Sequence, residues 1–201
     1  MADIEGFILA GGASSRMGSD KALLRLRGEP FVGRVERALR RVAPRVRVVS
    51  SRHEGAAFGL EVVPDRFEGR GAIGGLHAAL AACEAGWAAV VSCDLPFVTG
   101  EMLSRLASLR GPETDAVAPT QADGRRQPLC ALYARDACLP VVERLIREGE
   151  LRPRALLSEV RTRLVAFEEL ADLDGSRLFF SNVNTPEDYR LALGYANEGE
   201  G

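Results

Sequence analysis

The sequence predicts an α/β fold: one three-layer domain in which a mostly parallel, mixed sheet is covered by helices on both faces. Two observations predict this class. Short apolar runs typical of buried strands alternate with stretches of helical spacing. The 201 residues contain no linker and no internal repeat, and they are enough for one domain with a substantial core. We therefore expect a single Rossmann-like domain over residues 1–195, followed by a disordered tail at 196–201.

The first half of the chain contains four predicted strands and two predicted helices. The strand Gly6–Ala10 is an apolar run that glycines terminate, and the helix Phe31–Val42 separates its apolar residues from its arginines. The apolar face holds Phe31, Val35, Leu39 and Val42, and the basic face holds Arg34, Arg37 and Arg41. The remaining elements are strands at Val46–Ser50, Leu60–Val63 and Ala88–Ser92 and an Ala-rich helix at Gly74–Cys83.

The second half continues the alternation of strands and helices. The elements expected there are helices at Glu101–Arg110 and Asp136–Arg147, strands at Asp115–Pro119 and Leu129–Tyr133, and a last helix that Pro186 opens. In such a sheet, ligands bind beyond the carboxyl ends of the strands. Candidate site residues are therefore those that directly follow each predicted strand.

Composition and charge exclude several classes of protein. Hydrophobic residues make up 46% of the chain and charged residues 27%, which is ordinary for a globular protein. With a formal charge of −2 and a pI near 5.8, the chain has no overall attraction to nucleic acid or anionic membranes. No apolar run approaches the ~20 residues of a membrane span, so we expect a soluble, cytoplasmic protein. The four cysteines form no CxxC pair and are expected to be buried, reduced thiols: Cys83, Cys93, Cys130 and Cys138.

The stretch FILAGGASSRMGSDKALL, residues 7–24, follows the first strand with a high density of glycine and positive charge. Gly11 and Gly12 let the main chain approach a ligand closely, while Arg16 and Lys21 bring full charges. These features equip the loop to bind phosphates. The spacing matches neither a Walker A loop nor the GxGxxG dinucleotide motif. A glycine-rich surface turn is the alternative interpretation.

Asp94 directly follows the buried strand Ala88–Ser92 and stands two residues before Pro96. Its carboxylate is therefore expected to point into the ligand cleft. Mg²⁺ is normally bound through one or two carboxylates together with substrate phosphates, so Asp94 is a candidate metal ligand. The alternative is that Asp94 caps the helix that follows.

Asp65 follows the predicted strand that begins at Leu60 and precedes a glycine-rich stretch at residues 69–75. Its carboxylate is placed to hydrogen-bond a base or ribose, or to cap a turn, and the sequence leaves both interpretations open. His77, on the helix beyond, is expected to be structural, and neither His77 nor His53 is assigned a catalytic role.

Asn182 and Asn184 alternate within Phe179–Asp188, at what we interpret as a strand end, so both amides are expected on the same side. Thr185 and Pro186 are a good N-cap and a good first helical residue, which explains half of the cluster as helix-start chemistry. The two amides are left to serve a substrate or a metal-bound water.

The motifs together resemble a known family. Leu9-Ala10-Gly11-Gly12, Ser15-Arg16-Met17-Gly18 and Asp20-Lys21 resemble the signature LAGGxSxRMGxDK of the molybdenum cofactor guanylyltransferases, the MobA-like nucleotidyltransferases. Gly71–Gly75, Cys93–Pro96 and Asn182–Pro186 resemble the family's later motifs, in the same order. The resemblance covers about Phe7 to Leu193 and implies a fold like that of the nucleotide-diphospho-sugar transferases.

The resemblance implies a reaction and its substrates. Members of the family transfer GMP from GTP to the terminal phosphate of the molybdenum-molybdopterin cofactor, with Mg²⁺, releasing pyrophosphate. Both reacting groups are anionic, so catalysis would consist largely of positioning and charge neutralisation. Transient contacts with proteins that supply or accept the cofactor are also implied, whereas nucleic acid and membrane are not.

By motif match, each candidate residue receives an implied role. The catalytic residues would be Arg16, Lys21 and Asp94, with Asp94 also carrying the metal. GTP would be bound by Leu9, Ala10, Gly11, Gly12, Lys21, Asp65 and Asp94. The molybdopterin side would be served by Asn182, Asn184 and Arg152.

Two further stretches fit the family pattern more loosely. Asp123–Pro128 carries Gln127 where relatives often have histidine, and Glu150–Arg154 resembles a segment where the family places arginine for the cofactor phosphate. Solvated surface charge explains either stretch equally well. Ser50 and Ser51 replace a common asparagine, and Ala72 a common proline.

Several alternative functions share part of this pattern. Relatives that transfer CMP usually carry LAAG, whereas Gly12 here leaves room for a purine. A nucleotidyltransferase acting on a sugar phosphate would share the opening motif and Asp94. A non-catalytic molybdopterin carrier would not need Arg16, Lys21 and Asp94 together. A nucleic-acid-binding module, suggested by the arginines of residues 34–47, is disfavoured by the acidic pI.

Overall fold

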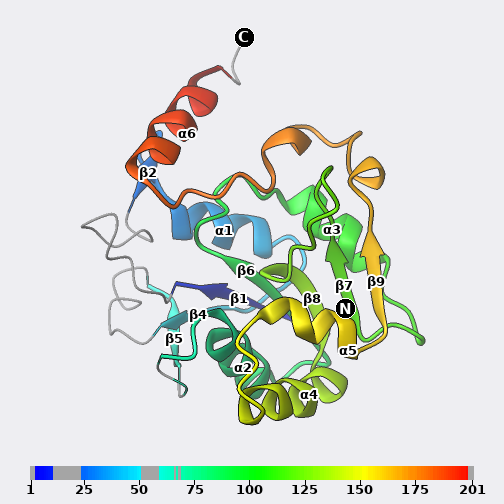
Figure 1. The fold of residues 1–201 in the computed structure, drawn as a ribbon. Helices are drawn as coiled ribbons and strands as arrows, with labels where there is room; N and C mark the ends of the chain where they lie inside the picture. Colours follow the sequence, from blue (N-terminus) through cyan, green and yellow to red (C-terminus); the bar gives the residue numbers. More distant parts are fainter. Residues whose placement is uncertain (1–2, 11–23, 51–58, 66, 68, 199–201) are drawn as a thin grey trace.

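The computed structural model describes residues 3–10, 24–50, 59–65, 67 and 69–198. These residues form the predicted three-layer α/β domain around a seven-stranded sheet (Figure 1). The strands of this sheet are β1 Ile4–Leu9, β4 Val46–Ser50, β5 Glu61–Pro64, β6 Trp87–Ser92, β7 Ala116–Pro119, β8 Cys130–Ala134 and β9 Thr162–Val165. Their order is β5-β4-β1-β6-β8-β7-β9.

The sheet is mixed, as predicted, because one strand runs against the others. Strands β5, β4, β1 and β6 are mutually parallel, β8 is antiparallel to both β6 and β7, and β9 is parallel to β7. Every strand of this sheet except β8 therefore ends on the same side. We call this side the carboxyl edge: it comprises the residues that follow Leu9, Ser50, Pro64, Ser92, Pro119 and Val165.

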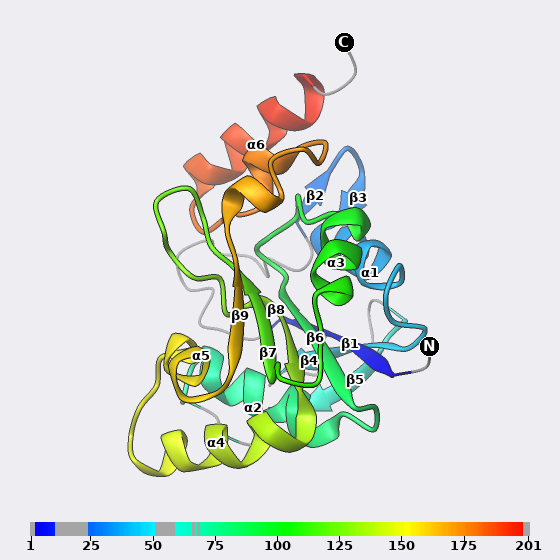
Figure 2. The same cartoon turned by 90° about the vertical axis from the view of Figure 1, so that its right-hand side faces the viewer.

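Helices cover both faces of the sheet (Figure 2). Helices α1 Phe31–Leu39 and α3 Gly100–Ser108 pack on one face, with α2 Ala72–Ala82, α4 Arg135–Arg147 and α5 Leu156–Glu159 on the other. The predicted division of α1 is confirmed, because its apolar face is buried. Helix α2 packs closely on β1, since a Cβ added to Gly75 would lie 3.7 Å from the side chain of Leu9.

Apart from the strand end expected at Asn182–Asn184, the predicted strands and helices are present, with boundaries that differ by at most three residues. Sequence reasoning missed the hairpin of β2 Arg25–Leu26 and β3 Glu29–Pro30, the edge strand β9, the short helix α5, and the 3-10 helices η4 Pro153–Ala155, η5 Phe167–Glu169 and η6 Ser176–Leu178. The hairpin turns through Arg27 and Gly28, both with positive φ, without the Asn-Gly or Asp-Gly pair that usually marks such a turn.

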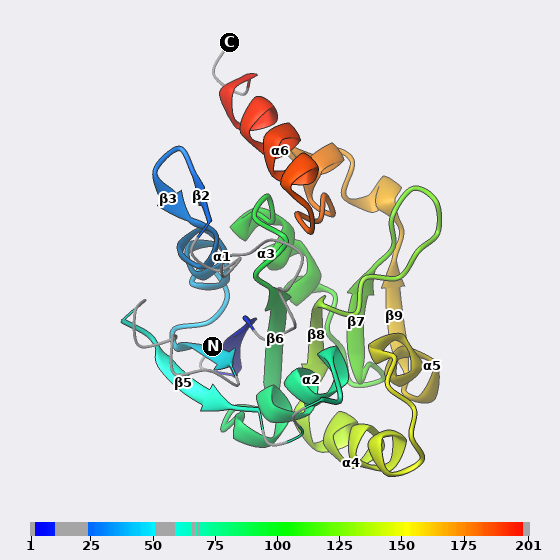
Figure 3. The same ribbon diagram turned by 60° about the vertical axis from the view of Figure 1, so that its left-hand side comes forward.

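The last helix, α6 Pro186–Glu198, projects beside the β2–β3 hairpin (Figure 3). The hydroxyl of Tyr189 donates to the carbonyl oxygen of Arg25 at 2.7 Å, and the two elements share an apolar cluster with Phe31 and Val183. Ala196 packs against the same cluster. The helix thus continues through Glu198, three residues into the predicted tail 196–201, and Ala196 of this tail contacts the apolar cluster.

Two further expectations concern the chain as a whole. All four cysteines are buried, as predicted, and within the described chain none of them forms a disulfide; burial raises the pKa of the Cys130 thiol to about 12. Among the described residues, no helix is long and apolar enough to span a membrane.

Candidate active site

Asp94 lies at the carboxyl edge, in the turn after β6. The turn is tied to the end of β1, because the Cys93 N–H donates to the carbonyl oxygen of Leu9 at 3.0 Å. The cap of α3 is Thr99, whose hydroxyl accepts from the Met102 N–H at 3.3 Å. The interpretation of Asp94 as the cap of the following helix is therefore wrong. Within the described parts of the chain, no group hydrogen-bonds the half-buried Asp94 carboxylate.

The donor set around Asp94 bears on which metal it would suit. Across the described ranges, no three histidine, cysteine or acidic side chains gather into a protein-only metal site. A single, unengaged carboxylate is instead what Mg²⁺ uses when substrate phosphates supply its other ligands. The residues present therefore fit a magnesium ion that is bound together with a phosphorylated substrate.

The Asn182–Asn184 segment lies beside Asp94, although the two are far apart in the sequence. The Val183 N–H donates to the Asp94 carbonyl oxygen at 3.0 Å. Val183 is buried, while Asn182 and Asn184 are both exposed. That the two amides point to the same side stays a prediction. The structure thus brings the motif Asn182–Pro186 next to the motif Cys93–Pro96.

The prediction that Asn182 and Asn184 end a strand is wrong, because the segment follows the 3-10 helix η6 and leads directly into α6. Its main chain is engaged by the helix start: the Asn184 and Thr185 N–H groups donate to the Asp188 carboxylate at 2.9 and 2.8 Å. The Thr185 hydroxyl accepts from the Asp188 N–H at 3.1 Å, which confirms Thr185 as the N-cap.

The first motif enters the described structure only at its start. The Ala10 N–H donates to the Val49 carbonyl oxygen at 3.0 Å, which places Leu9 and Ala10 at the carboxyl edge between β4 and β6. Gly11, Gly12, Arg16 and Lys21 lie outside the described residues, as do Ser51 and His53. Their roles stay predictions.

Asp65 performs the turn role that the sequence left open. Its Oδ1 atom accepts from the Phe67 N–H at 2.9 Å, and its carboxylate lies over the first turn of α2, where a Cβ added to Gly74 would be 3.1 Å from Oδ1. Contact with a nucleoside stays a prediction. His77 is buried, with its ring 4.7 Å from that of Phe67 and its Nε2 3.5 Å from Glu143 Oε1, as expected for a structural residue.

Beyond β7, a cavity of about 600 Å³ collects arginines from two distant segments. We call it the arginine pocket; its basic lining residues are Arg125, Arg126, Arg152 and Arg154. Arg125 and Arg126 lie in the loop after β7, while Arg152 directly precedes η4 and Arg154 lies within it. The two stretches with the looser family resemblance therefore meet here. Two hydrogen bonds connect the loop after β7 to the carboxyl edge. The Gln127 N–H donates to the Pro119 carbonyl oxygen at 2.9 Å, and the Ser92 N–H donates to the Leu129 carbonyl oxygen at 2.8 Å.

The charges in the arginine pocket are only partly balanced. Hydrogen bonds from Arg152 lower the pKa of Glu150 to about 2, and those from the backbone and side chain of Arg125 lower the pKa of Asp123. Arg126 donates to the Ser158 hydroxyl at 2.8 Å. No carboxylate in the described structure pairs with Arg126 or Arg154, so the pocket keeps a positive surplus.

Sequence reasoning selected Arg152 for this region and left its three neighbours as undecided surface charge. The available signal was the pair of basic stretches DGRRQP and ELRPR. Neither stretch alone indicates a pocket, because their proximity arises only when β7 and β9 pair.

Comparison with known proteins agrees with this arrangement. Residues 6–164 match the family model of the MobA-like NTP transferase domain. A probable molybdenum cofactor guanylyltransferase of Pelotomaculum thermopropionicum is 36% identical over 189 residues, which cover 94% of this chain and 91% of the relative. A molybdenum cofactor guanylyltransferase of Desulfosudis oleivorans is 30% identical over 191 residues, covering 94% of both chains.

The same relationship appears in three dimensions. The crystal structure of molybdopterin-guanine dinucleotide biosynthesis protein A from Archaeoglobus fulgidus is similar with a TM-score of 0.78 and 28% identity, over 96% of this chain and 99% of that one. This confirms the predicted nucleotide-diphospho-sugar-transferase-like fold. The chain is a nucleotidyltransferase and belongs to the MobA-like NTP transferase family.

Proposed function

We propose that the protein transfers GMP from GTP to the terminal phosphate of the molybdenum-molybdopterin cofactor, giving its guanine dinucleotide form and pyrophosphate in a Mg²⁺-dependent reaction. The observation that carries this proposal is the division of the carboxyl edge at Asp94. On one side are the ends of β1, β4 and β5, and on the other is the arginine pocket. Asn182–Asn184 adjoin Asp94 itself, through the hydrogen bond from the Val183 N–H. The names of the relatives support the choice of substrates.

The donor half would bind GTP on the β1 side of Asp94. Leu9 and Ala10 offer main-chain groups at the strand end, where the nucleoside would lie. Gly11 and Gly12 would continue this contact, Asp65 would add a side-chain contact, and Arg16 and Lys21 would hold the triphosphate.

The acceptor half would bind the molybdopterin cofactor on the β7 side. Arg152 and its neighbours in the arginine pocket match an anionic phosphate in charge and in hydrogen-bond donors. Asn182 and Asn184, exposed beside Asp94, would contact the acceptor where it meets the donor.

The reaction requires two anions to meet. An oxygen of the acceptor phosphate forms a bond to the α-phosphorus of GTP, and the bond from that phosphorus to the bridging oxygen of pyrophosphate breaks. Arg16 and Lys21 would neutralise the departing pyrophosphate, and the protein supplies no covalent nucleophile. Mg²⁺ held by Asp94, when bound, would add positive charge at the phosphates.

The test supplies the purified protein with Mg²⁺, molybdenum-loaded molybdopterin and each of the four nucleoside triphosphates in turn. Product mass and pyrophosphate release are measured. We expect a guanine dinucleotide from GTP alone, formed only when the cofactor is present. Product from CTP would overturn the choice of base, and turnover with sugar phosphates but not with molybdopterin would overturn the choice of acceptor.

A further inference from the structure

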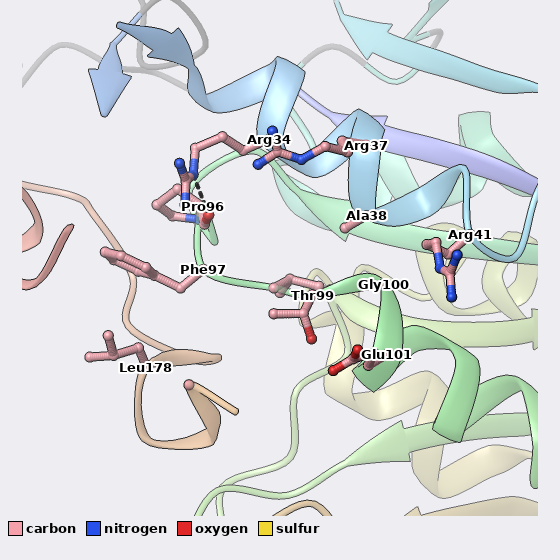
Figure 4. Close-up of a pocket in the computed structure, with 12 residues that line it drawn as sticks. Arg34, Arg37, Ala38, Arg41, Pro96, Phe97, Thr99, Gly100, Glu101 and Leu178 are labelled. Atoms are coloured by element: carbon pink, nitrogen blue, oxygen red, sulfur yellow. Dashed lines mark hydrogen bonds between the residues drawn. The ribbon is translucent and has the colours of Figure 1, made fainter. Parts of the chain in front are cut away.

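A second cavity, of about 620 Å³, lies on the other face of the sheet from the arginine pocket, between α1 and the start of α3 (Figure 4). We call it the α1 groove; the lining residues used here are Arg34, Arg37, Arg41, Phe97, Gly100 and Leu178. The reaction proposed above does not use it, and the inference drawn from it does not depend on that reaction. It borders the loop that carries Asp94, because the Arg34 Nε donates to the Pro96 carbonyl oxygen at 3.0 Å.

The three arginines line one side of the groove. Arg34 and Arg37 lie on α1, and Arg41 lies in the turn two residues beyond Leu39, the last residue of that helix. One carboxylate serves two of them: Glu29 lies 3.6 Å from Arg34 Nη1 and 3.0 Å from Arg37 Nη1. In the described part of the chain, nothing pairs with the guanidinium of Arg41.

The stem of Arg41 packs against the first turn of α3. A Cβ added to Gly100 would lie 2.1 Å from its Cγ and 2.9 Å from its Cβ, so only glycine lets the Arg41 stem cross this turn. The start of a helix carries partial positive charge, which does not compensate a nearby cation. Among the described residues that line the groove, Glu101 is the one with a carboxylate. An anionic ligand would relieve this excess of positive charge.

The other end of the groove is apolar. Phe97 and Leu178 are both half-buried, and Figure 4 shows them together, away from Arg41. Phe97 also packs against the cluster of Leu26 and Phe31, which fixes its position. The groove therefore offers a line of cations that ends in an apolar contact.

We propose that the α1 groove binds an acidic segment of a partner protein, with carboxylates along Arg37 and Arg41 and an apolar side chain against Phe97 and Leu178. A line of separated guanidinium groups matches acidic side chains spaced along a chain, whereas one small phosphate would require donors that converge. The apolar end adds a contact that inorganic anions lack.

The test uses a short fluorescein-labelled peptide in which aspartates flank a Leu-Phe pair, with binding followed by anisotropy. Arg37→Glu combined with Arg41→Glu should weaken binding ~10-fold or more, and Phe97→Ala several-fold. Arg40→Glu is the matched control, because Arg40 is exposed on the same helix and pairs with Glu36 at 2.7 Å outside the groove. It should change the affinity less than ~2-fold.

Three results would overturn the proposal: no saturable binding of the peptide, equal weakening by Arg40→Glu, or displacement of the peptide by pyrophosphate at concentrations below the peptide's own Kd. The last would make the groove a small-anion site.

Thermal melting of each variant checks the fold. Turnover with free substrates should be unchanged in the double variant, so a failure here is distinct from a failure of the proposed reaction.

Discussion

The two halves of the carboxyl edge present different groups to the anions that we propose they bind. Over β1, β4 and β5, the donor half offers strand-end main chain, glycine-rich stretches and the single carboxylate of Asp94. Over β7 and β9, the acceptor half offers long cationic side chains around a cavity of about 600 Å³. Both halves belong to one sheet and flank the same turn.

The difference explains why one half is visible in the sequence and the other is not. A main chain that approaches a ligand closely needs glycine at neighbouring positions. The residues of the donor half therefore form short, continuous motifs in the sequence. Long side chains reach a common point from distant segments. Arg126 and Arg152 therefore become neighbours only through the pairing of β7 with β9 and the placement of η4.

The largest effect is expected at the turn that both halves share. Asp94→Asn should lower kcat by ~10²–10³-fold, because it removes the negative charge that would hold the metal. The fold should persist, since no described group hydrogen-bonds the carboxylate. Mg²⁺-dependent pyrophosphate release and a thermal melt measure the two properties. Near-normal turnover at the same Mg²⁺ concentration would remove Asp94 from the site.

The second-largest effect is expected on stability, at a buried ion pair that joins two strands of the donor half. Glu5 on β1 and Arg47 on β4 form an ion pair at 2.9 Å with side chains only 8% and 5% exposed. Glu5→Gln leaves the buried Arg47 charge without its main partner and should lower the free energy of unfolding by about 3 kcal/mol. Glu61→Gln, at the 53% exposed partner of the same arginine, is the control and should cost under about 1 kcal/mol. Equal losses in urea denaturation would contradict the account.

A smaller effect should separate the two halves directly. Arg126→Ala or Arg152→Ala should raise KM for the acceptor ~10-fold and leave KM for GTP unchanged, because only the acceptor phosphate would lose a charged donor. Arg147→Ala, at an exposed position near the end of α4, is the control. An equal rise in both KM values would mean that the arginine pocket is not confined to the acceptor.

The smallest effect concerns competition within the arginine pocket. Arg152 is held by Glu150 through a bond from Nε to Oε1 at 2.8 Å. Glu150→Gln frees the guanidinium and should lower the acceptor KM ~2–3-fold. The pKa of Glu150 is lowered to about 2, so the pair is present above its ordinary range near 4.5 and is lost only as pH falls towards 2. The gain from Glu150→Gln should therefore be constant between pH 5 and 8, and a gain that varied across this range would assign it to another group.

Most of the fold follows from periodicity, and the exceptions are short or lack a local signal. The strands β1, β4 and β6 are mostly apolar, apart from the paired Glu5 and Arg47, because both faces of the sheet are covered. The edge strand β9 has a single buried residue, Val165, and so leaves no pattern to detect. In the segment before α6, the alternation of exposed Asn182, buried Val183 and exposed Asn184 is the pattern of a strand. The Asn184 N–H instead donates to Asp188 at the start of α6, so the prediction of a strand end fails here.

We propose that GTP and the molybdopterin cofactor occupy different halves of the carboxyl edge and bind there at the same time. The most direct measurement is equilibrium dialysis of the protein with molybdopterin and a GTP analogue whose α and β phosphorus atoms are joined by a methylene group, so that no reaction occurs. The account predicts one bound molecule of each, with neither displacing the other. Mutual displacement would show that the two share a single site and would contradict the division of the edge at Asp94.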